Sequence, residues 1–193
     1  MSAMTNQITS SINEPNIPMK KTSITLLTTS AFAFCAALLL ASNGIAAEKD
    51  TLNAADVKFI KQEAAAGMAV VKTAGLGAQK TSREDIKAFA QMLVTDHTAA
   101  NDQLAKLAAT KGVETSTVID PKDAEHYQTL EKSSGTEFDK EFLAEIVRGH
   151  KKCVSNFEEA STDAKDSDLK AWATGMLPTL KTHLGKAMEL SAK

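Results

Sequence analysis

The sequence predicts an all-α protein built from four long helices. In four segments, apolar residues recur at alternating spacings of three and four, which is the period of one helix face. The 193 residues include only nine glycines and four prolines, too few to punctuate many strands and turns. Outside residues 113–119, no stretch alternates between apolar and polar residues as a half-buried strand does.

The N-terminal part of the chain has the pattern of a secretory signal peptide. Lys20 and Lys21 precede an uncharged run over residues 24–40, which is followed by small residues up to Ala47. We therefore interpret residues 19–47 as a signal peptide, cleaved after Ala46 or Ala47, and residues 1–18 as an N-terminal extension or an upstream start. The predicted location is the periplasm, and residues 48–193 form the predicted folded domain.

An uncleaved anchor is the alternative for this segment. The apolar run is about 17 residues long, at the short limit for crossing a bilayer. In that case the protein would be anchored to the envelope through its N-terminal helix. We expect membrane contact only in this case.

The first two long helices are predicted over residues 54–79 and 83–111. Asn53 and Asp56 have the spacing of a capping box at the start of the first helix. Ser82 and Asp85 have the same spacing at the start of the second, and Gly112 supplies its C-cap.

A connector and two more long helices follow. Residues 113–119 are β-branched and polar, which favours an extended segment, and Asp120-Pro121 places an N-cap before a short helix over residues 121–133. The third long helix opens at residues 136–139 and keeps its apolar seam to Ala160. The polar stretch 161–167 is the predicted hinge to the last helix, whose seam runs from Leu169 to Leu190.

The lengths of the connections predict the topology. Short turns within the first and last helix pairs make two antiparallel hairpins, whereas about 25 residues separate the second and third long helices. This connection, which carries the short helix, is long enough to run back along the bundle. The prediction is a ferritin-like four-helix bundle, and a simple up-down bundle is the alternative.

Three histidines occupy seam positions of three different helices, where Leu or Ala would be expected. They are His97, His150 and His183. His97 and His150 each lie about 14 residues beyond their helix starts, which puts them at similar height if these helices are parallel. His183 is offset by roughly 9 Å, but the tilt of helical side chains toward their own N-termini reduces this separation. Glu63 on the first helix is level with His97.

The functional interpretation is a divalent transition metal held by three imidazoles and the Glu63 carboxylate. Imidazole suits zinc, copper, iron or nickel, and Asp96 is a candidate acceptor for a ligand's second nitrogen. Cys153, three residues after His150, is an alternative ligand or a small core residue. The competing interpretation is a polar layer in which the histidines bond to one another, to Glu63, to backbone or to water.

Several function classes are excluded or disfavoured. A formal net charge of −2 gives no broad electrostatic footprint for nucleic acid. Ferritin-like oxidases need two Glu-x-x-His motifs in the bundle, and this chain has neither. No phosphate-binding glycine loop and no nucleophile elbow is present. We predict a non-enzymatic exported protein that binds a metal, or alternatively a structural or stress-related envelope interaction protein without one.

Several motifs also resemble a known bacterial family. They are Asp96-His97-Thr98-Ala99-Ala100-Asn101, Phe138-Asp139, Gly149-His150-Lys151-Lys152, and Leu177-Pro178-Thr179-Leu180 with His183. In this order and spacing they are similar to the exported domain of unknown function 4142, from about Asp56 to Leu190. The resemblance implies a ferritin-like helical bundle in the cell envelope and no established activity. Val70 departs from the glutamate typical of the family's Gly-Met-Ala-Glu segment.

Overall fold

The computed structural model describes residues 51–115 and 118–193, and all regular structure there is helical. The five helices are α1 (Ala54–Lys80), α2 (Glu84–Thr110), α3 (Pro121–Lys132), α4 (Gly135–Asp163) and α5 (Ser167–Ser191). The predicted N-terminal extension, signal peptide and cleavage site lie outside the described residues. Within the described ranges, no helix has a stretch both long and apolar enough to cross a bilayer.

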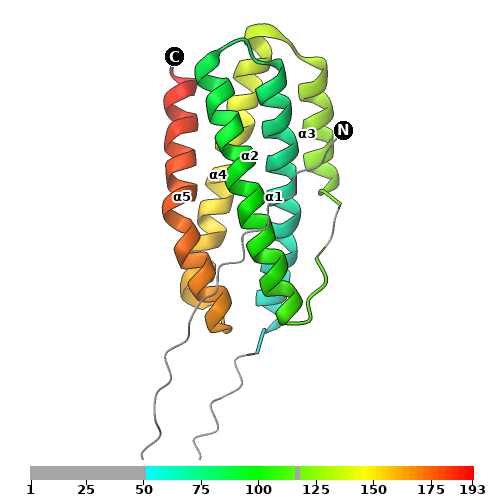
Figure 1. Cartoon of the computed structure of the whole chain (residues 1–193), viewed down its shortest axis with the longest axis vertical. Coiled ribbons are helices and arrows are strands. Elements are labelled where there is room, and N and C mark those ends of the chain that lie inside the picture. The colour runs from blue at the N-terminus through cyan, green and yellow to red at the C-terminus, as the bar shows by residue number, and fades with distance from the viewer. Residues whose placement is uncertain (1–50, 116–117) are drawn as a thin grey trace, which may run out of the picture. The chain divides into compact units, whose positions relative to one another are not determined.

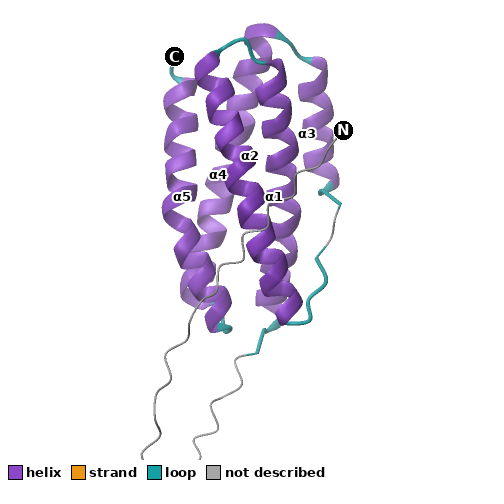
Figure 2. Cartoon of the chain, in the orientation of Figure 1, coloured by secondary structure: helices purple, strands orange, loops and turns teal. Residues whose placement is uncertain are grey.

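The four long helices lie side by side (Figures 1 and 2). α1 packs along α2 and α4 packs along α5, with further contacts between α1 and α4 and between α2 and α5. α1 and α5 run in one direction, and α2 and α4 run in the other (Figure 1). The connection after α2 returns along the outside through α3, which contacts α1 and α4.

The helix starts confirm two predictions and correct one. Asn53 and Asp56 form the reciprocal capping box of α1, and Asp120 caps α3 ahead of Pro121. The capping box predicted at Ser82 is wrong. α2 begins at Glu84 after Arg83, which makes no side-chain cap hydrogen bond and instead pairs with Asp85. Because this ion pair engages Asp85, the acidic residue of the predicted box contacts a side chain rather than closing the box.

The predicted hinge over residues 161–167 is too long. α4 continues to Asp163 and α5 starts at Ser167, so the turn is only three residues. Polar side chains do not break α4 here because Ser161 and Thr162 donate hydrogen bonds to backbone carbonyls of the preceding turn, at Glu158 and Glu159.

Polar contacts fasten both ends of the helices. At one end, the Lys111 ammonium lies 2.6 Å from the fully buried Asp166 carboxylate. The backbone N–H groups of Lys165 and Asp166 also donate to Asp56 at that end. At the other end, the Lys80 ammonium donates to the carbonyls of Glu131 and Ser133, which ties α3 to α1.

The apolar core is divided by a polar layer. One cluster, which we call the apolar end, lies near the α1–α2 and α3–α4 turns; its buried members include Ile86, Phe89, Leu93, Phe138, Phe142, Ile146, Ala187 and Leu190. Two further clusters contain Ile60, Leu104 and Leu169, and Phe157, Ala173 and Leu180. His97, His150 and His183 each lie four residues, about one helical turn, from a member of the apolar end.

Candidate metal centre

The three seam histidines converge in the core, as the metal-site interpretation of the sequence requires. His97 comes from α2, His150 from α4 and His183 from α5. Their exposed fractions are 7%, 1% and 2%, respectively. We call these three residues the histidine layer.

The geometry of the histidine layer would allow one ion to be shared. One ligand atom from each residue lies within 4.8 Å of the other two. The three pairs of ring centroids are 5.3, 5.5 and 5.5 Å apart. The Nε2 atoms of His97 and His150 are 3.3 Å apart. Among the described residues, the group close enough to hold one ion consists of these three histidines alone.

Hydrogen bonds to groups outside the histidine layer determine which ring nitrogen of His150 and of His183 carries the hydrogen. His150 Nδ1 lies 3.0 Å from the Ile146 carbonyl oxygen, and His183 Nε2 lies 2.9 Å from an Asp96 carboxylate oxygen. Because a carbonyl and a carboxylate only accept, both of these ring nitrogens carry the hydrogen. In the neutral form of each ring, the lone pair is therefore on Nε2 of His150 and on Nδ1 of His183. Asp96 thus takes the acceptor role predicted for it.

The atom His183 Nδ1 is a buried acceptor that lacks a hydrogen-bond partner among the described residues. A buried polar atom without a partner costs about 1–3 kcal/mol, and native proteins contain few of them. Its position against two other imidazoles marks it as a candidate ligand atom.

Burial keeps His97 and His150 uncharged at neutral pH. Desolvation lowers the pKa of His97 to about 3, with smaller effects from His150 and His183. Desolvation also lowers the pKa of His150 to about 4, partly opposed by the hydrogen bond to Ile146. A metal ligand must be the neutral imidazole, so these two residues do not need to lose protons before binding an ion.

Glu63 is placed beside the histidine layer, where its carboxylate makes two other contacts. It accepts hydrogen bonds from Asn156 Nδ2 at 2.7 Å and from Cys153 Sγ at 3.5 Å. Desolvation raises the pKa of Glu63, and these two bonds partly oppose it. Burial, followed by the nearby Glu63, also raises the pKa of the Cys153 thiol. Cys153 is thus held as a thiol donor to Glu63, and it forms no disulfide.

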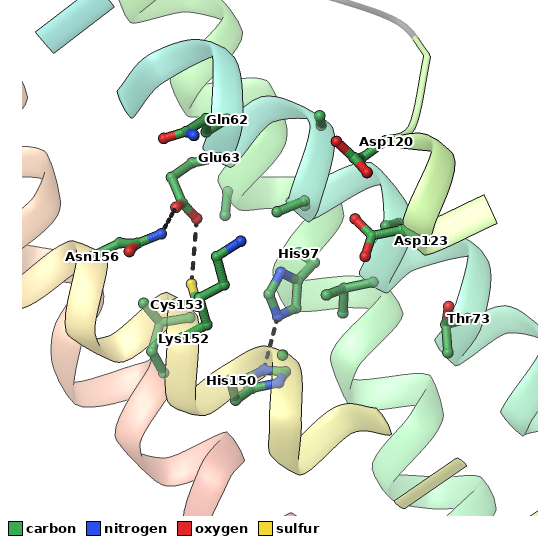
Figure 3. A pocket seen from close by; sticks show the side chains of 18 of the residues that line it. Gln62, Glu63, Thr73, His97, Asp120, Asp123, His150, Lys152, Cys153 and Asn156 are labelled. Atoms are coloured by element: carbon green, nitrogen blue, oxygen red, sulfur yellow. Dashed lines mark hydrogen bonds between the residues drawn. The ribbon is translucent and has the colours of Figure 1, made fainter. Parts of the chain in front are cut away.

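A cavity of about 360 Å³ adjoins the site, with His97, His150, Glu63 and Cys153 in its wall (Figure 3). The first turns of α3 also line it, through Asp120 and Asp123. Several lining positions hold small residues, including Ala65, Ala66, Gly67, Ala69, Ala100 and Gly149. This volume falls within the range of small-molecule pockets in proteins.

Three groups at the site were not predicted from the sequence: Asn156, Lys152 and the Ile146 carbonyl. Asn156 is a polar residue three positions after Cys153, so the seam spacing of α4 could have identified it. The Ile146 carbonyl has no sequence signal because each residue carries one. The position of the Lys152 side chain, which reaches between Glu63 and His97 in Figure 3, depends on the space left between helices.

Comparisons with known proteins place the chain in a family. A crystal structure of a DUF305 fragment from Deinococcus radiodurans is similar, with a TM-score of 0.66 and 13% identity, covering 74% of this chain and 98% of that one. At this identity the likeness shows the fold alone. No curated protein matches the chain. The model of the domain of unknown function DUF4142 matches residues 41–190, and the chain therefore belongs to the DUF4142 family.

Proposed function

We propose that this protein is an exported ferritin-like four-helix bundle that binds one divalent transition metal through His97, His150 and His183. The observation that carries the metal proposal is the buried, unpartnered Nδ1 of His183, which lies against two other imidazoles. A bound cation would satisfy this atom together with the lone pairs of the other two residues.

The hydrogen bonds behind two of the ligands support the same proposal. Metal-bound histidines commonly donate their other N–H to a carboxylate or a backbone carbonyl, which fixes the ring and its tautomer. His183 makes such a bond to Asp96, and His150 makes one to Ile146. A ligand set of three imidazoles suits zinc, copper, iron or nickel and not magnesium or calcium, which prefer oxygen.

Glu63 keeps a supporting role in this proposal. Its oxygens are engaged by Asn156 and Cys153, so its ligation would require those bonds to be exchanged for a bond to the metal. We therefore assign metal ligation to the three histidines. Glu63 is a neighbouring carboxylate that accepts a hydrogen bond from Cys153.

The proposed bundle class and location rest on connectivity and on the N-terminal pattern. The connection from α2 to α4 runs back along the outside through α3, as the long crossover of a ferritin-like bundle does. The order of basic, apolar and small residues before Ala47 supports export to the periplasm. The intact mass of the protein from the envelope tests export, because a species that retains residues 24–40 would identify an anchor instead.

Metal analysis combined with thermal unfolding tests the site. Protein isolated without chelators should contain about one equivalent of metal. At a free metal concentration a hundred times Kd, binding adds about 2.7 kcal/mol to the free energy of unfolding, or about 5–10 °C in Tm for a domain of this size. His97→Ala should abolish this shift, whereas His126→Ala, on the half-exposed histidine of α3, should keep it.

A polar layer without metal is the second candidate function, within a structural or stress-related envelope protein. The 3.3 Å approach of His97 Nε2 to His150 Nε2 favours it, because these imidazoles can hydrogen-bond directly. In that case zinc, copper, nickel and iron(II) should all leave Tm unchanged. His97→Ala should still destabilise the protein by leaving its polar partner unpaired, at about 1–3 kcal/mol.

A further inference from the structure

Glu63 is a buried carboxylate in the cavity wall, and both of its hydrogen-bond donors are uncharged. Its exposed fraction is 6%, and the donors are the Asn156 amide and the Cys153 thiol (Figure 3). In the described part of the chain, no ammonium or guanidinium group forms an ion pair with Glu63. Burying an ionised carboxylate without a cation is costly, which is why desolvation raises the pKa of this group. A cation bound at Glu63 would offset that cost.

The charges around the cavity also favour a cation over an anion. One of the cationic side chains, Arg148, already donates to Glu145. The other two are exposed lysines, whose charges water screens, and the Lys152 charge has the smallest of the effects on the pKa of Glu63. Carboxylates outnumber cations in the wall, with Glu63, Asp120, Asp123 and Glu145 against Lys122, Arg148 and Lys152.

An apolar, aromatic part of the wall lies beside Glu63. Phe59 precedes Glu63 by one turn on α1, and Phe157 directly follows Asn156 on α4. The ring centroids of Phe59 and Phe157 are 5.2 Å apart, and those of Phe157 and Trp172 are also 5.2 Å apart. The apolar residues of the cavity wall include Leu104, Phe157, Trp172, Met176 and Leu180. A ligand in the cavity would therefore meet a carboxylate and, next to it, a hydrocarbon surface.

We infer that the cavity binds a small alkylammonium ion, whose ammonium group donates to the Glu63 carboxylate and whose alkyl group packs against Phe157 and Trp172. An ionised carboxylate has about four acceptor sites, so the ammonium can join the two present donors without displacing them. The volume of about 360 Å³ is in the range of small-molecule pockets. This inference goes beyond the proposed metal site and does not depend on a metal at the histidine layer.

Titration of the metal-free full chain tests the inference, at neutral pH, with a chelator and at constant ionic strength. The probe is n-butylammonium; n-butanol matches its size without the charge, and butyrate carries the opposite charge. Trp172 is the one tryptophan of the chain and lines the cavity, so its fluorescence reports binding. Calorimetry gives a second measurement. We expect saturable binding of n-butylammonium, binding of n-butanol at least about tenfold weaker, and none of butyrate, because a hydrogen bond to a charged group carries the difference.

Glu63→Gln tests the recognition group, with Glu159→Gln as its control. Glutamine keeps the shape of Glu63 and removes its charge, whereas Glu159 is an exposed residue of α4 that is not part of the cavity wall. Glu63→Gln should weaken n-butylammonium binding at least about tenfold and leave n-butanol binding unchanged. Glu159→Gln should behave as wild type. Asp123→Asn, which removes a carboxylate from the α3 side of the cavity, should change the affinity less than Glu63→Gln does.

Gly149→Leu tests the location, with Gly175→Leu as its control. Both glycines lie within helices with open space around the added Cβ, but only Gly149 lines the cavity. Leu at position 149 should fill part of the cavity and weaken the binding of n-butylammonium and n-butanol alike. Gly175→Leu should leave both unaffected. Circular dichroism checks that each variant is folded.

Three results would overturn the inference. If n-butylammonium produces neither a fluorescence change nor heat, the cavity does not bind alkylammonium ions. If n-butanol binds as tightly, or if Glu63→Gln binds n-butylammonium as wild type does, the Glu63 carboxylate does not recognise the ligand. If Gly149→Leu binds as wild type does, the ligand lies outside the cavity. The metal proposal is tested separately, by metal analysis and thermal unfolding, so each can fail without the other.

Discussion

The apolar end and the histidine layer are built from the same helices and the same seams, yet they are packed in opposite ways. At the apolar end, Phe138 and Phe142 are completely buried and stack with ring centroids 6.0 Å apart. One turn along, the histidine layer has an unpartnered nitrogen and adjoins a cavity. One continuous helix face can therefore support a dry core and a candidate binding site in succession.

Two glycines show how this difference arises. At Gly77 an added Cβ would lie 2.6 Å from the Phe142 ring, so glycine lets the aromatic side chain pack directly against α1. At Gly149 an added Cβ would meet nothing, so the same residue type contributes space. The first glycine closes the core and the second leaves it open.

The largest expected difference between the two regions is their response to acid. The pKa values of His97 and His150 lie at about 3 and about 4 in the fold, below the ordinary value of 6.5. Between these values the unfolded chain binds protons that the folded chain does not, so stability is full above pH 6.5 and falls as the pH drops toward 4. At about 1.4 kcal/mol per pH unit and imidazole, the loss by pH 4 is about 6 kcal/mol for the metal-free protein.

Denaturant unfolding of the metal-free protein across this pH range measures the effect. The double variant His97→Leu/His150→Leu is the control, because leucine does not titrate. Its stability should depend much less on pH. Equal slopes for the two proteins would contradict the assignment of neutral, buried imidazoles.

The next effect concerns the apolar end alone. Phe142→Ala should lower the free energy of unfolding by about 3–5 kcal/mol, because it removes a fully buried ring and leaves a cavity against α1. Copper affinity, measured under conditions where the variant is folded, should be unchanged. A loss of copper binding by the folded variant would show that the two regions are coupled.

A pair of substitutions at His97 should separate polarity from packing. His97→Ala should destabilise the metal-free protein by about 1–3 kcal/mol, because it leaves a cavity and unpaired polar groups. His97→Leu should be neutral or stabilising by about 1 kcal/mol, since it extends the apolar seam. Both should lose metal binding, and equal destabilisation by the two variants in urea would contradict this account.

The smallest expected effects come from two glycine-to-alanine substitutions, which should change the free energy of unfolding in opposite directions. Gly149→Ala should stabilise the protein by about 0.5–1 kcal/mol through helix propensity, because its Cβ enters open space. Gly77→Ala should destabilise it by about 1 kcal/mol, because the rigid Phe142 ring must move. Melting curves of the two variants measure the difference, and a stabilising Gly77→Ala would show that the apolar end has room to relax.

Local signals in the sequence were sufficient for the helices, and they indicated that the histidines could lie at similar heights. Helical periodicity and caps such as Asn53 and Asp120 act within a few residues, so they predicted the starts of α1 and α3. The heights of His97 and His150 follow from a fixed rise per residue. The errors at Ser82 and at residues 161–167 came from side chains that have two local partners available, a backbone group or a neighbouring side chain.

Tertiary packing alone decided which hydrogen bonds the residues of the site form. The sequence placed Glu63 level with His97, but the rotation of α1 against α4 brings its carboxylate to Asn156 and Cys153. The Asp96 bond to His183 fixes the free nitrogen at Nδ1, and that choice depends on two helices whose spacing no local pattern sets. The cavity is likewise a property of several helices together, because empty space between side chains depends on how closely their backbones approach. A sequence therefore determines which residues face the core, and only the packed helices determine which of their atoms remain without partners.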